Sequence, residues 1–298
     1  MPFNTLDPNV RSDWLTIGSA SLLDGCSADR PMVTRLLGNS LRAWRGAATQ
    51  PVVVADGRSL PVLERHGYLW VHTGEGPQRA LFELPEYDEP GRRIVDCGGI
   101  GVATSGLRVV ENFLDMGHFP YIHTGTLGKV PHTEVAPYRT HIEAATGEIW
   151  ALDCHFFQPR ASASAADGID AQYRYRVMQP FTAALYKSSP NRSDAQDVIG
   201  LFVQPLDEDH VIAHVLLVYF EDRLGDADMI GFQHMIFGQD KPILESQRPR
   251  RLPLHGALEA HMRCDLTSTT YRRWLRQRGM TFGVHPDSDR DRQSLEPR

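Results

Sequence analysis

Apolar and polar residues alternate along most of the chain from about Gly98 onward. Because successive side chains of a strand point to opposite faces, a period of two predicts an antiparallel sheet with one buried face. Turn residues separate the alternating runs. The pattern predicts strands over residues 101–109, 140–144, 149–158, 170–179, 182–188, 198–205 and 210–220.

A helical period follows over residues 226–245, where the apolar residues fall mostly on one side. A long curved sheet that grips this helix gives an α+β fold of the helix-grip type, with an elongated cavity. Such cavities suit small aromatic molecules with a few polar groups. Candidate lining residues are Phe113, Phe119, Phe156, Phe232, Met235 and Phe237, although core packing is the more frequent role of such side chains.

The first part of the chain reads as short strands over residues 14–17, 33–36, 40–44, 52–54 and 67–72, separated by turn residues. We therefore expect a small β-rich unit over residues 1–97 and a larger catalytic domain over residues 98–283. Residues 284–298 are mostly charged and polar, which predicts a disordered tail.

The larger unit holds, near its start, an ordered set of polar residues, Asn112, Asp115, His118 and His123. Asp115 and His118 are three residues apart, so on a helix the carboxylate can hold the imidazole in one tautomer. His123 would point elsewhere on a regular helix, but Pro120 interrupts the helix and can bring both rings to one point. A single histidine is usually a packed or surface residue, whereas the ordered set is typical of a metal site.

A mononuclear iron centre with two histidines needs a carboxylate as its third ligand and keeps positions open for oxygen. Asp265, at the start of an amphipathic segment, is the predicted carboxylate. A helix N-cap explains an aspartate at this place equally well.

The segment from Arg108 to His123 resembles the catalytic-iron motif of Rieske-type non-haem iron oxygenases. Residues 243–247 through 271–275 resemble the carboxyl-terminal part of their demethylase-like branch, and the resemblance covers nearly the whole chain. It implies Fe(II) held by His118, His123 and Asp265, with O2 as co-substrate. It also implies that Asp115, in one motif with Asn112, links an iron-bound histidine to an incoming electron donor.

Members of that family bind a two-iron, two-sulfur cluster near the amino terminus through Cys-x-His and Cys-x-x-His pairs. Both pairs are absent here, because the 18 residues between Arg45 and Glu64 contain no cysteine or histidine. His66 and His72 are better explained as strand residues than as substitute ligands. The four cysteines are widely scattered and read as reduced thiols. We therefore expect no iron-sulfur cluster in this chain and a separate Rieske protein or reductase as electron donor.

The resemblance implies oxygen-dependent hydroxylation that demethylates a small N-methylated substrate. Among members without a cluster, the chain most resembles those that act on methylxanthines at N7 in bacterial caffeine breakdown. Two alternatives stay open: a binding or scaffolding subunit of an oxygenase complex, and a metal-dependent hydrolase that activates water with the same ligands. Ligand binding without a metal would favour the first, and turnover without oxygen the second.

Composition limits the range of partners. The 298 residues, 41% of them hydrophobic, can bury a sizeable core, and the net charge of −6 without any basic run argues against nucleic acid. No apolar run is long enough for a membrane span, and the amino terminus does not resemble a leader, so we expect a cytoplasmic location. The resemblance implies a homo-oligomer or a hetero-complex.

Overall fold

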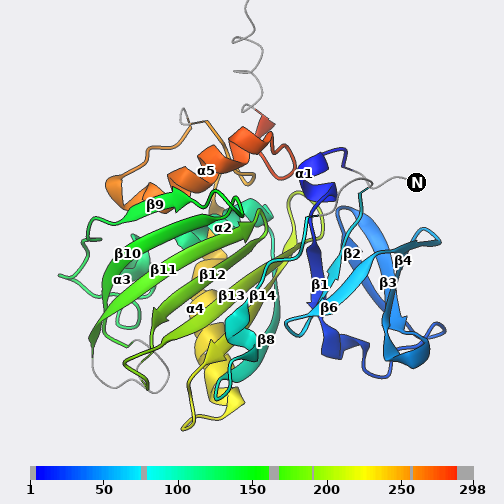
Figure 1. The fold of residues 1–298 in the computed structure, drawn as a ribbon. Helices are drawn as coiled ribbons and strands as arrows, with labels where there is room; N and C mark the ends of the chain where they lie inside the picture. Colours follow the sequence, from blue (N-terminus) through cyan, green and yellow to red (C-terminus); the bar gives the residue numbers. More distant parts are fainter. Residues whose placement is uncertain (1–4, 75–78, 161–167, 190, 256–257, 287–298) are drawn as a thin grey trace, which may run out of the picture.

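A seven-stranded antiparallel sheet forms the centre of the computed structural model, which describes residues 5–74, 79–160, 168–189, 191–255 and 258–286 (Figure 1). The strand order is β8-β14-β13-β12-β11-β10-β9, so most strands pair with their neighbours in sequence. The strands are β8 (Arg93–Val102), β9 (Arg139–Ile142), β10 (Ile149–Gln158), β11 (Ile169–Gln179), β12 (Thr182–Ser188), β13 (Gln196–Pro205) and β14 (Val211–Tyr219). The strands predicted between residues 140 and 220 are confirmed, with small shifts at their ends.

The strand predicted over residues 101–109 is wrong. β8 ends at Val102, and helix α2 (Gly106–Leu114) follows it. Ser105 begins the helix, since its hydroxyl accepts the backbone N–H of Leu107 at 3.3 Å. The helix is buried on most sides, including the charged residues Arg108 and Glu111. It therefore lacks the exposed polar face by which a helical period is normally recognised.

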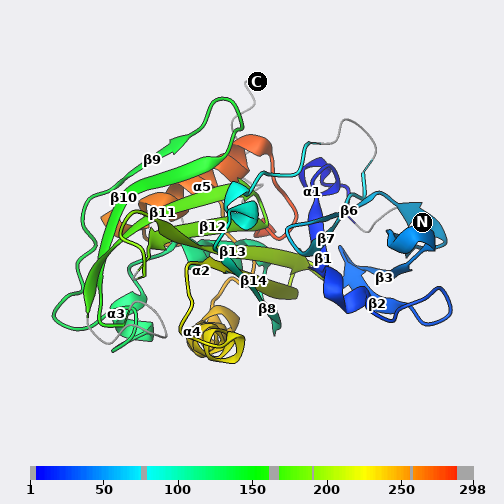
Figure 2. The same cartoon turned by 60° about the horizontal axis from the view of Figure 1, so that its bottom comes forward.

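Two longer helices complete the predicted helix-grip arrangement. Helix α4 (Asp226–Ser246) agrees with the predicted helix and packs against β8 and α2. Figure 2 views α4 nearly along its axis, on one side of the sheet. Helix α5 (Leu266–Arg278) packs against β9 and β10. The short helices are α1 (Pro8–Arg11), α3 (Phe119–Ile122) and the 3-10 turns η1 (Ala20–Leu23), η2 (Ala47–Thr49), η3 (Pro85–Asp88) and η4 (Arg263–Asp265). The α+β fold class is confirmed.

The residues ahead of β8 form two smaller antiparallel sheets, ordered β1-β7-β6 and β2-β3-β4-β5. Their strands are β1 (Leu15–Ser19), β2 (Met32–Leu36), β3 (Asn39–Arg45), β4 (Pro51–Ala55), β5 (Arg58–Leu60), β6 (Val62–Arg65) and β7 (Tyr68–Val71). The predicted short strands are all present, and β5 and β6 add to them. The predicted boundary after residue 97 falls inside β8. Residues 287–298 of the predicted tail lie outside the described residues.

The two faces of the large sheet carry different parts of the core. Along β13, Ile199 points to the side of α2 and α4, whereas Val198 and Phe202 point to the opposite side. The ring of Phe202 meets the rings of Tyr68 and Trp70 in β7, with centroid distances of 5.0 Å for each pair. The amino-terminal strands thus cover one face of the sheet and leave the other face to the helices.

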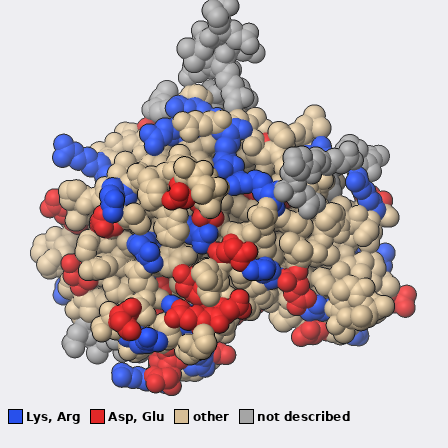
Figure 3. Space-filling model, viewed as in Figure 1, with Lys and Arg blue, Asp and Glu red and all other residues tan. Residues whose placement is uncertain are grey.

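Charged side chains of both signs are interspersed over the face shown in Figure 3. This mixture agrees with the modest net charge of −6. Among the described residues, no helix is long and apolar enough to cross a membrane.

A buried ion network holds α2 against α5. Arg272 of α5 donates to Glu111 of α2 at 2.8 Å and to the Pro253 carbonyl at 2.9 Å. Arg108 of α2 donates to Glu259 at 3.2 Å, and Glu259 is also paired with Arg272. Both arginines are at most 5% exposed. Because each charge has an opposite partner, removal of one member leaves the others buried without compensation.

The substitution Arg272→Met is expected to lower the free energy of unfolding by about 3–5 kcal/mol, since it leaves Arg108 alone to compensate the carboxylates of Glu111 and Glu259. Urea denaturation of the full chain measures this loss. The exposed neighbour Arg273 offers a matched control, and Arg273→Met should change stability by no more than about 0.5 kcal/mol. Equal effects of the two substitutions would contradict a stabilising network.

Candidate functional site

The two histidines of the sequence motif meet at the junction of α2 and α3. Helix α2 ends at Leu114, and α3 begins at Phe119, with Pro120 in its first turn. Pro120 therefore starts a new short helix instead of bending a longer one, as proline favours the first turn. The Nε2 atoms of His118 and His123 lie 3.1 Å apart.

Asp115 shapes this junction with both of its carboxylate oxygens. Its Oδ1 accepts the backbone N–H of Gly117 at 2.7 Å, which turns the chain after α2. Its Oδ2 lies 3.1 Å from Nδ1 of His118. Since a carboxylate only accepts, His118 carries a proton on Nδ1 and its Nε2 is directed inward.

His123 is oriented in the same manner from the opposite side. Its Nδ1 lies 2.8 Å from Oε1 of Gln239 in α4, so the amide oxygen fixes the tautomer. His123 itself is 1% exposed. Both imidazoles therefore present Nε2 toward the same point.

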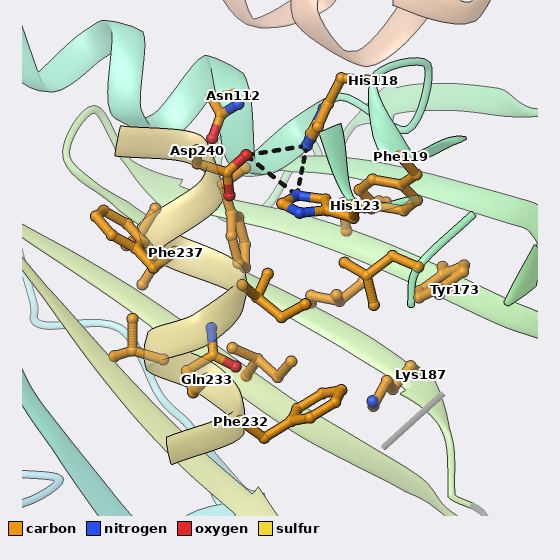
Figure 4. Close-up of a pocket in the computed structure, with 18 of the residues that line it drawn as sticks. Asn112, His118, Phe119, His123, Tyr173, Lys187, Phe232, Gln233, Phe237 and Asp240 are labelled. Atoms are coloured by element: carbon orange, nitrogen blue, oxygen red, sulfur yellow. Dashed lines mark hydrogen bonds and ion pairs between the residues drawn. The ribbon is translucent and has the colours of Figure 1, made fainter. Parts of the chain in front are cut away.

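Asp240 brings a carboxylate to this point from α4 (Figure 4). Its Oδ1 lies 3.3 Å from Nε2 of His118 and 3.1 Å from Nε2 of His123. Neither contact has the direction of a hydrogen bond, and Oδ1 has no other partner in the described part of the chain. Ligand atoms about 2.1 Å from one metal ion and at right angles to each other lie about 3 Å apart. The three separations thus fit one face of an octahedral metal site.

The charges of the site already favour a cation at its centre. Burial would lower the pKa of His118, but the carboxylates of Asp115 and Asp240 outweigh it and raise the pKa to about 9. Burial would raise the pKa of Asp240, but contacts with His118 and His123 hold that pKa below its usual value. Without a metal, a proton on His118 therefore supplies the positive charge that a metal ion would bring.

Asp265, which the sequence analysis named as the third ligand, is not in this group. Its carboxylate accepts the backbone N–H of Met262 at 2.7 Å and lies 3.4 Å from the Cys264 sulfur. It occupies the N-cap position of α5, which the sequence analysis gave as the alternative explanation of this aspartate. The structure places Asp240 where Asp265 was expected.

A signal for Asp240 is present in the sequence. The buried apolar residues of α4 repeat after seven positions, from Met229 to Ile236 and from Phe237 to Leu244, and Asp240 lies three positions after Phe237 and four before Leu244. Asp240 continues this row and is itself buried at 7% exposure. An acidic residue inside a buried apolar row requires a partner, which would have marked Asp240 as a candidate ligand. Gln239 carries no comparable signal.

A cavity opens beside the three ligand atoms, between α2, α4 and the sheet. It has an empty volume of about 790 Å³ including its open part. Figure 4 shows the ligand group at one end and Phe232, Gln233 and Lys187 at the other. Burial lowers the pKa of Lys187 to about 8, and Asp197 partly opposes this effect.

Four of the six predicted pocket residues line this cavity: Phe113, Phe119, Phe232 and Phe237. Phe156 lies behind the wall, where its ring packs edge-on against Phe119 with centroids 5.5 Å apart. Met235 is 40% exposed and lies on the solvent side of α4. The predictions that Phe156 and Met235 line the cavity are therefore wrong.

Asn112 borders both the cavity and a neighbouring surface depression, whereas Asp115 borders only the depression. Asn112 lines the cavity and approaches Asp240 from α2 (Figure 4). Asp115 lines a separate surface depression together with Asp265 and His261. His118 borders both spaces, so its ring lies between the cavity and the outer surface.

The comparisons with known proteins agree with this geometry. Residues 102–279 match the family model of the vanillate O-demethylase oxygenase C-terminal domain. A protein of Pseudomonas sp. (strain TJI-51), described as "Probable methylxanthine N7-demethylase NdmC", is 44% identical over 277 residues, covering 92% of this chain and 96% of that protein.

Solved structures share the fold. The structure of NdmA with caffeine from Pseudomonas putida CBB5 superposes with a TM-score of 0.73 at 19% identity, covering 90% of both chains. NdmB of the same bacterium gives a TM-score of 0.72 at 19% identity, covering 92% of both chains. The family match, the identity over nearly the full length and the shared fold lead to one conclusion. This chain belongs to the vanillate O-demethylase oxygenase family, the demethylase-like branch of the Rieske-type non-haem iron oxygenases, and lacks the sequence pairs that hold a Rieske cluster.

Proposed function

We propose that the chain is the catalytic subunit of an oxygen-dependent methylxanthine N-demethylase. Fe(II) is held by His118, His123 and Asp240, and electrons come from a separate Rieske protein. The observation that carries the proposal is the meeting of three ligand atoms at one end of a small-molecule cavity. The choice of substrate is supported by the 44% identical relative, whose description names a methylxanthine N7-demethylase.

Bound at this site, Fe(II) would supply the activation of O2 for hydroxylation of a neighbouring C–H bond. An N-methyl group hydroxylated in this way releases formaldehyde and leaves an N–H. Substrate, O2, two electrons and two protons thus become demethylated product, formaldehyde and water. Because the chain holds no cluster ligands, both electrons must come from outside.

The chain's own residues prepare this chemistry by fixing ligands and excluding water. The side chains of Asp115 and Gln239 keep the two imidazoles turned inward, which lowers the reorganisation needed on metal binding. The rings of Phe119 and Phe237 line the cavity beside the ligand group and offer flat apolar surfaces to a planar substrate. The substrate would lie next to the metal and not on it.

Asp115 is the proposed entry point for electrons. It contacts His118 at one ring nitrogen, while the other ring nitrogen faces the ligand group. It also lines the outer depression, where a partner protein can approach. Electrons from a donor that docks there would reach the metal site through the Asp115 carboxylate and the His118 imidazole.

The assignment of the carboxylate ligand is tested by two substitutions. Asp240→Ala is expected to weaken metal binding at least about 100-fold, because it removes one of three ligand groups. Asp265→Ala should leave the metal content near one ion per chain. Metal analysis after anaerobic loading with Fe(II) measures both. Loss of metal in the Asp265 variant alone would contradict the assignment of Asp240.

Metal binding is expected to depend on pH through His118. Its raised pKa of about 9 means that the protonated form dominates at lower pH, and this proton must leave when the metal binds. The apparent affinity should therefore rise about tenfold per pH unit between pH 7 and 9 and then level off.

Competition with a chelator for Zn²⁺ at several pH values measures this slope. Asp115→Asn removes one cause of the raised pKa, so the affinity of this variant should level off at a lower pH. An affinity of the parent that does not change between pH 7 and 8.5 would contradict the protonated state of His118.

The function itself is tested by formaldehyde release from 7-methylxanthine with a purified Rieske reductase. Activity should require Fe(II), O2 and the reductase together. Asp115→Asn should keep its iron but lose turnover at least about 100-fold, because the link between donor and His118 loses its charge. Asp265→Asn, in the same depression, should stay within about threefold of the parent. Turnover without the reductase would contradict external electron delivery, and turnover without O2 would indicate a hydrolase.

A further inference from the structure

One wall of the cavity carries buried polar atoms that have no hydrogen-bond partner in the part of the chain that the structure describes. These atoms are the hydroxyl oxygens of Tyr173 and Tyr175 in β11 and Oε1 of Gln158 in β10. All three side chains line the cavity and are at most 2% exposed. Folded proteins pair nearly all buried polar groups, so a cluster of unpaired ones in a cavity wall points to a ligand that completes them.

Three buried or half-buried tyrosines away from the cavity have paired hydroxyls. The hydroxyl of Tyr271 donates to the Pro180 carbonyl at 2.6 Å, that of Tyr138 to the Cys264 carbonyl at 2.7 Å, and that of Tyr68 to Asp96 at 2.6 Å. Each of these three lies outside the residues that line the cavity. The unpaired hydroxyls are thus a feature of the cavity wall and not of buried tyrosines in general.

The two unpaired tyrosines form a regular pair of donors. They are two residues apart on one strand, so both side chains stand on the same face of the sheet. Their rings are nearly parallel, with an interplanar angle of 23° and centroids 6.2 Å apart. Burial raises the pKa of both hydroxyls well above the usual value, so both keep their protons and donate hydrogen bonds.

The pair is placed beside the reaction centre. The Tyr173 ring lies 6.5 Å from the ring of Phe119, which neighbours His123, and the Tyr175 ring lies 6.2 Å from that of Phe113. Figure 4 shows Tyr173 on the side of the cavity opposite Phe237. The neighbouring wall is apolar, with Leu185, Ile199, Leu201 and Val215. A purely apolar ligand would therefore leave both hydroxyls unpaired.

We propose that Tyr173 and Tyr175 form a recognition subsite that donates hydrogen bonds to two carbonyl oxygens on one ring of the substrate. The inference rests on the proposed function and narrows its substrate class to N-methylated heterocycles with a dicarbonyl ring, such as the pyrimidinedione ring of a xanthine. The subsite holds that ring against the sheet and directs the N-methyl group to the three ligands. N-methylated purines without carbonyl groups are rejected, because they leave buried donors unpaired.

The test measures binding and not turnover, so that it is separate from the proposed reaction. The Zn²⁺-loaded full chain is titrated by calorimetry with 7-methylxanthine, which has two carbonyls, and with 7-methylpurine, which has none. The parent should bind 7-methylxanthine at least about tenfold more tightly. Tyr173→Phe and Tyr175→Phe should each weaken 7-methylxanthine binding about fivefold and leave 7-methylpurine binding unchanged.

Stability distinguishes this role from a structural one. Because the removed hydroxyls have no partner among the described residues, neither variant should lower Tm. Tyr271→Phe is the matched control, since its hydroxyl is paired and lies away from the cavity. It should lower Tm and leave binding of both ligands as in the parent.

The results separate the subsite from the function. If the two tyrosine variants bind both ligands more weakly by the same factor, or bind both as the parent does, the subsite is overturned even if the enzyme demethylates 7-methylxanthine. The expected binding pattern without any demethylation would uphold the subsite and overturn the function. If the parent binds neither ligand, the subsite and its substrate class are overturned. Metal binding by the Asp240→Ala variant still tests the iron site.

Discussion

The site depends on holding one aspartate of α4 against two imidazoles that come from a segment more than a hundred residues away. Two side chains fix the position of α4 along β8. His234 Nε2 lies 2.7 Å from the Cys97 carbonyl, and Lys241 donates to the Gly101 carbonyl at 2.8 Å, so both ends of this stretch of α4 are tied to β8. A slide of α4 by one residue would break both contacts and move Asp240 by about 1.5 Å, enough to disrupt a metal site. The edge strand of the sheet therefore sets the ligand geometry.

Several buried polar atoms without a hydrogen-bond partner in the described part of the chain line this same cavity. Asp240 meets two imidazoles without hydrogen-bond geometry, two tyrosine hydroxyls are unpaired, and Lys187 is buried with a lowered pKa. The charges of Arg108, Glu111, Glu259 and Arg272 are paired with one another in a separate network. A distribution of this kind is typical of proteins that accept lower stability at the site where they bind ligands.

The sequence predicts what depends on local spacing and misses what depends on distant contacts. The strands from β9 to β14 and helix α4 follow from periods of two and 3.6, and the contact of Asp115 with His118 follows from a spacing of three. Helix α2 was missed because burial on most sides removes its polar face. Asp240 was missed because a charged residue in an amphipathic helix is normally assigned to the solvent side. The packing of α4 against the α2–α3 junction shows that Asp240 points inward.

The amino-terminal region shows how a domain can lose a cluster and keep a structural role. The 18-residue segment that lacks cluster ligands forms β4 and β5, joined by a two-residue turn at Asp56 and Gly57, whose φ angles are 48° and 77°. Such a turn matches the twist of the two strands and closes them without a metal. The region still covers the sheet face that carries Phe202, since Tyr68 and Trp70 pack directly on it. Removal of the whole region would expose these aromatic side chains to water. Coverage of the sheet therefore needs no cluster ligands in this chain, which agrees with the proposal that a separate protein supplies the electrons.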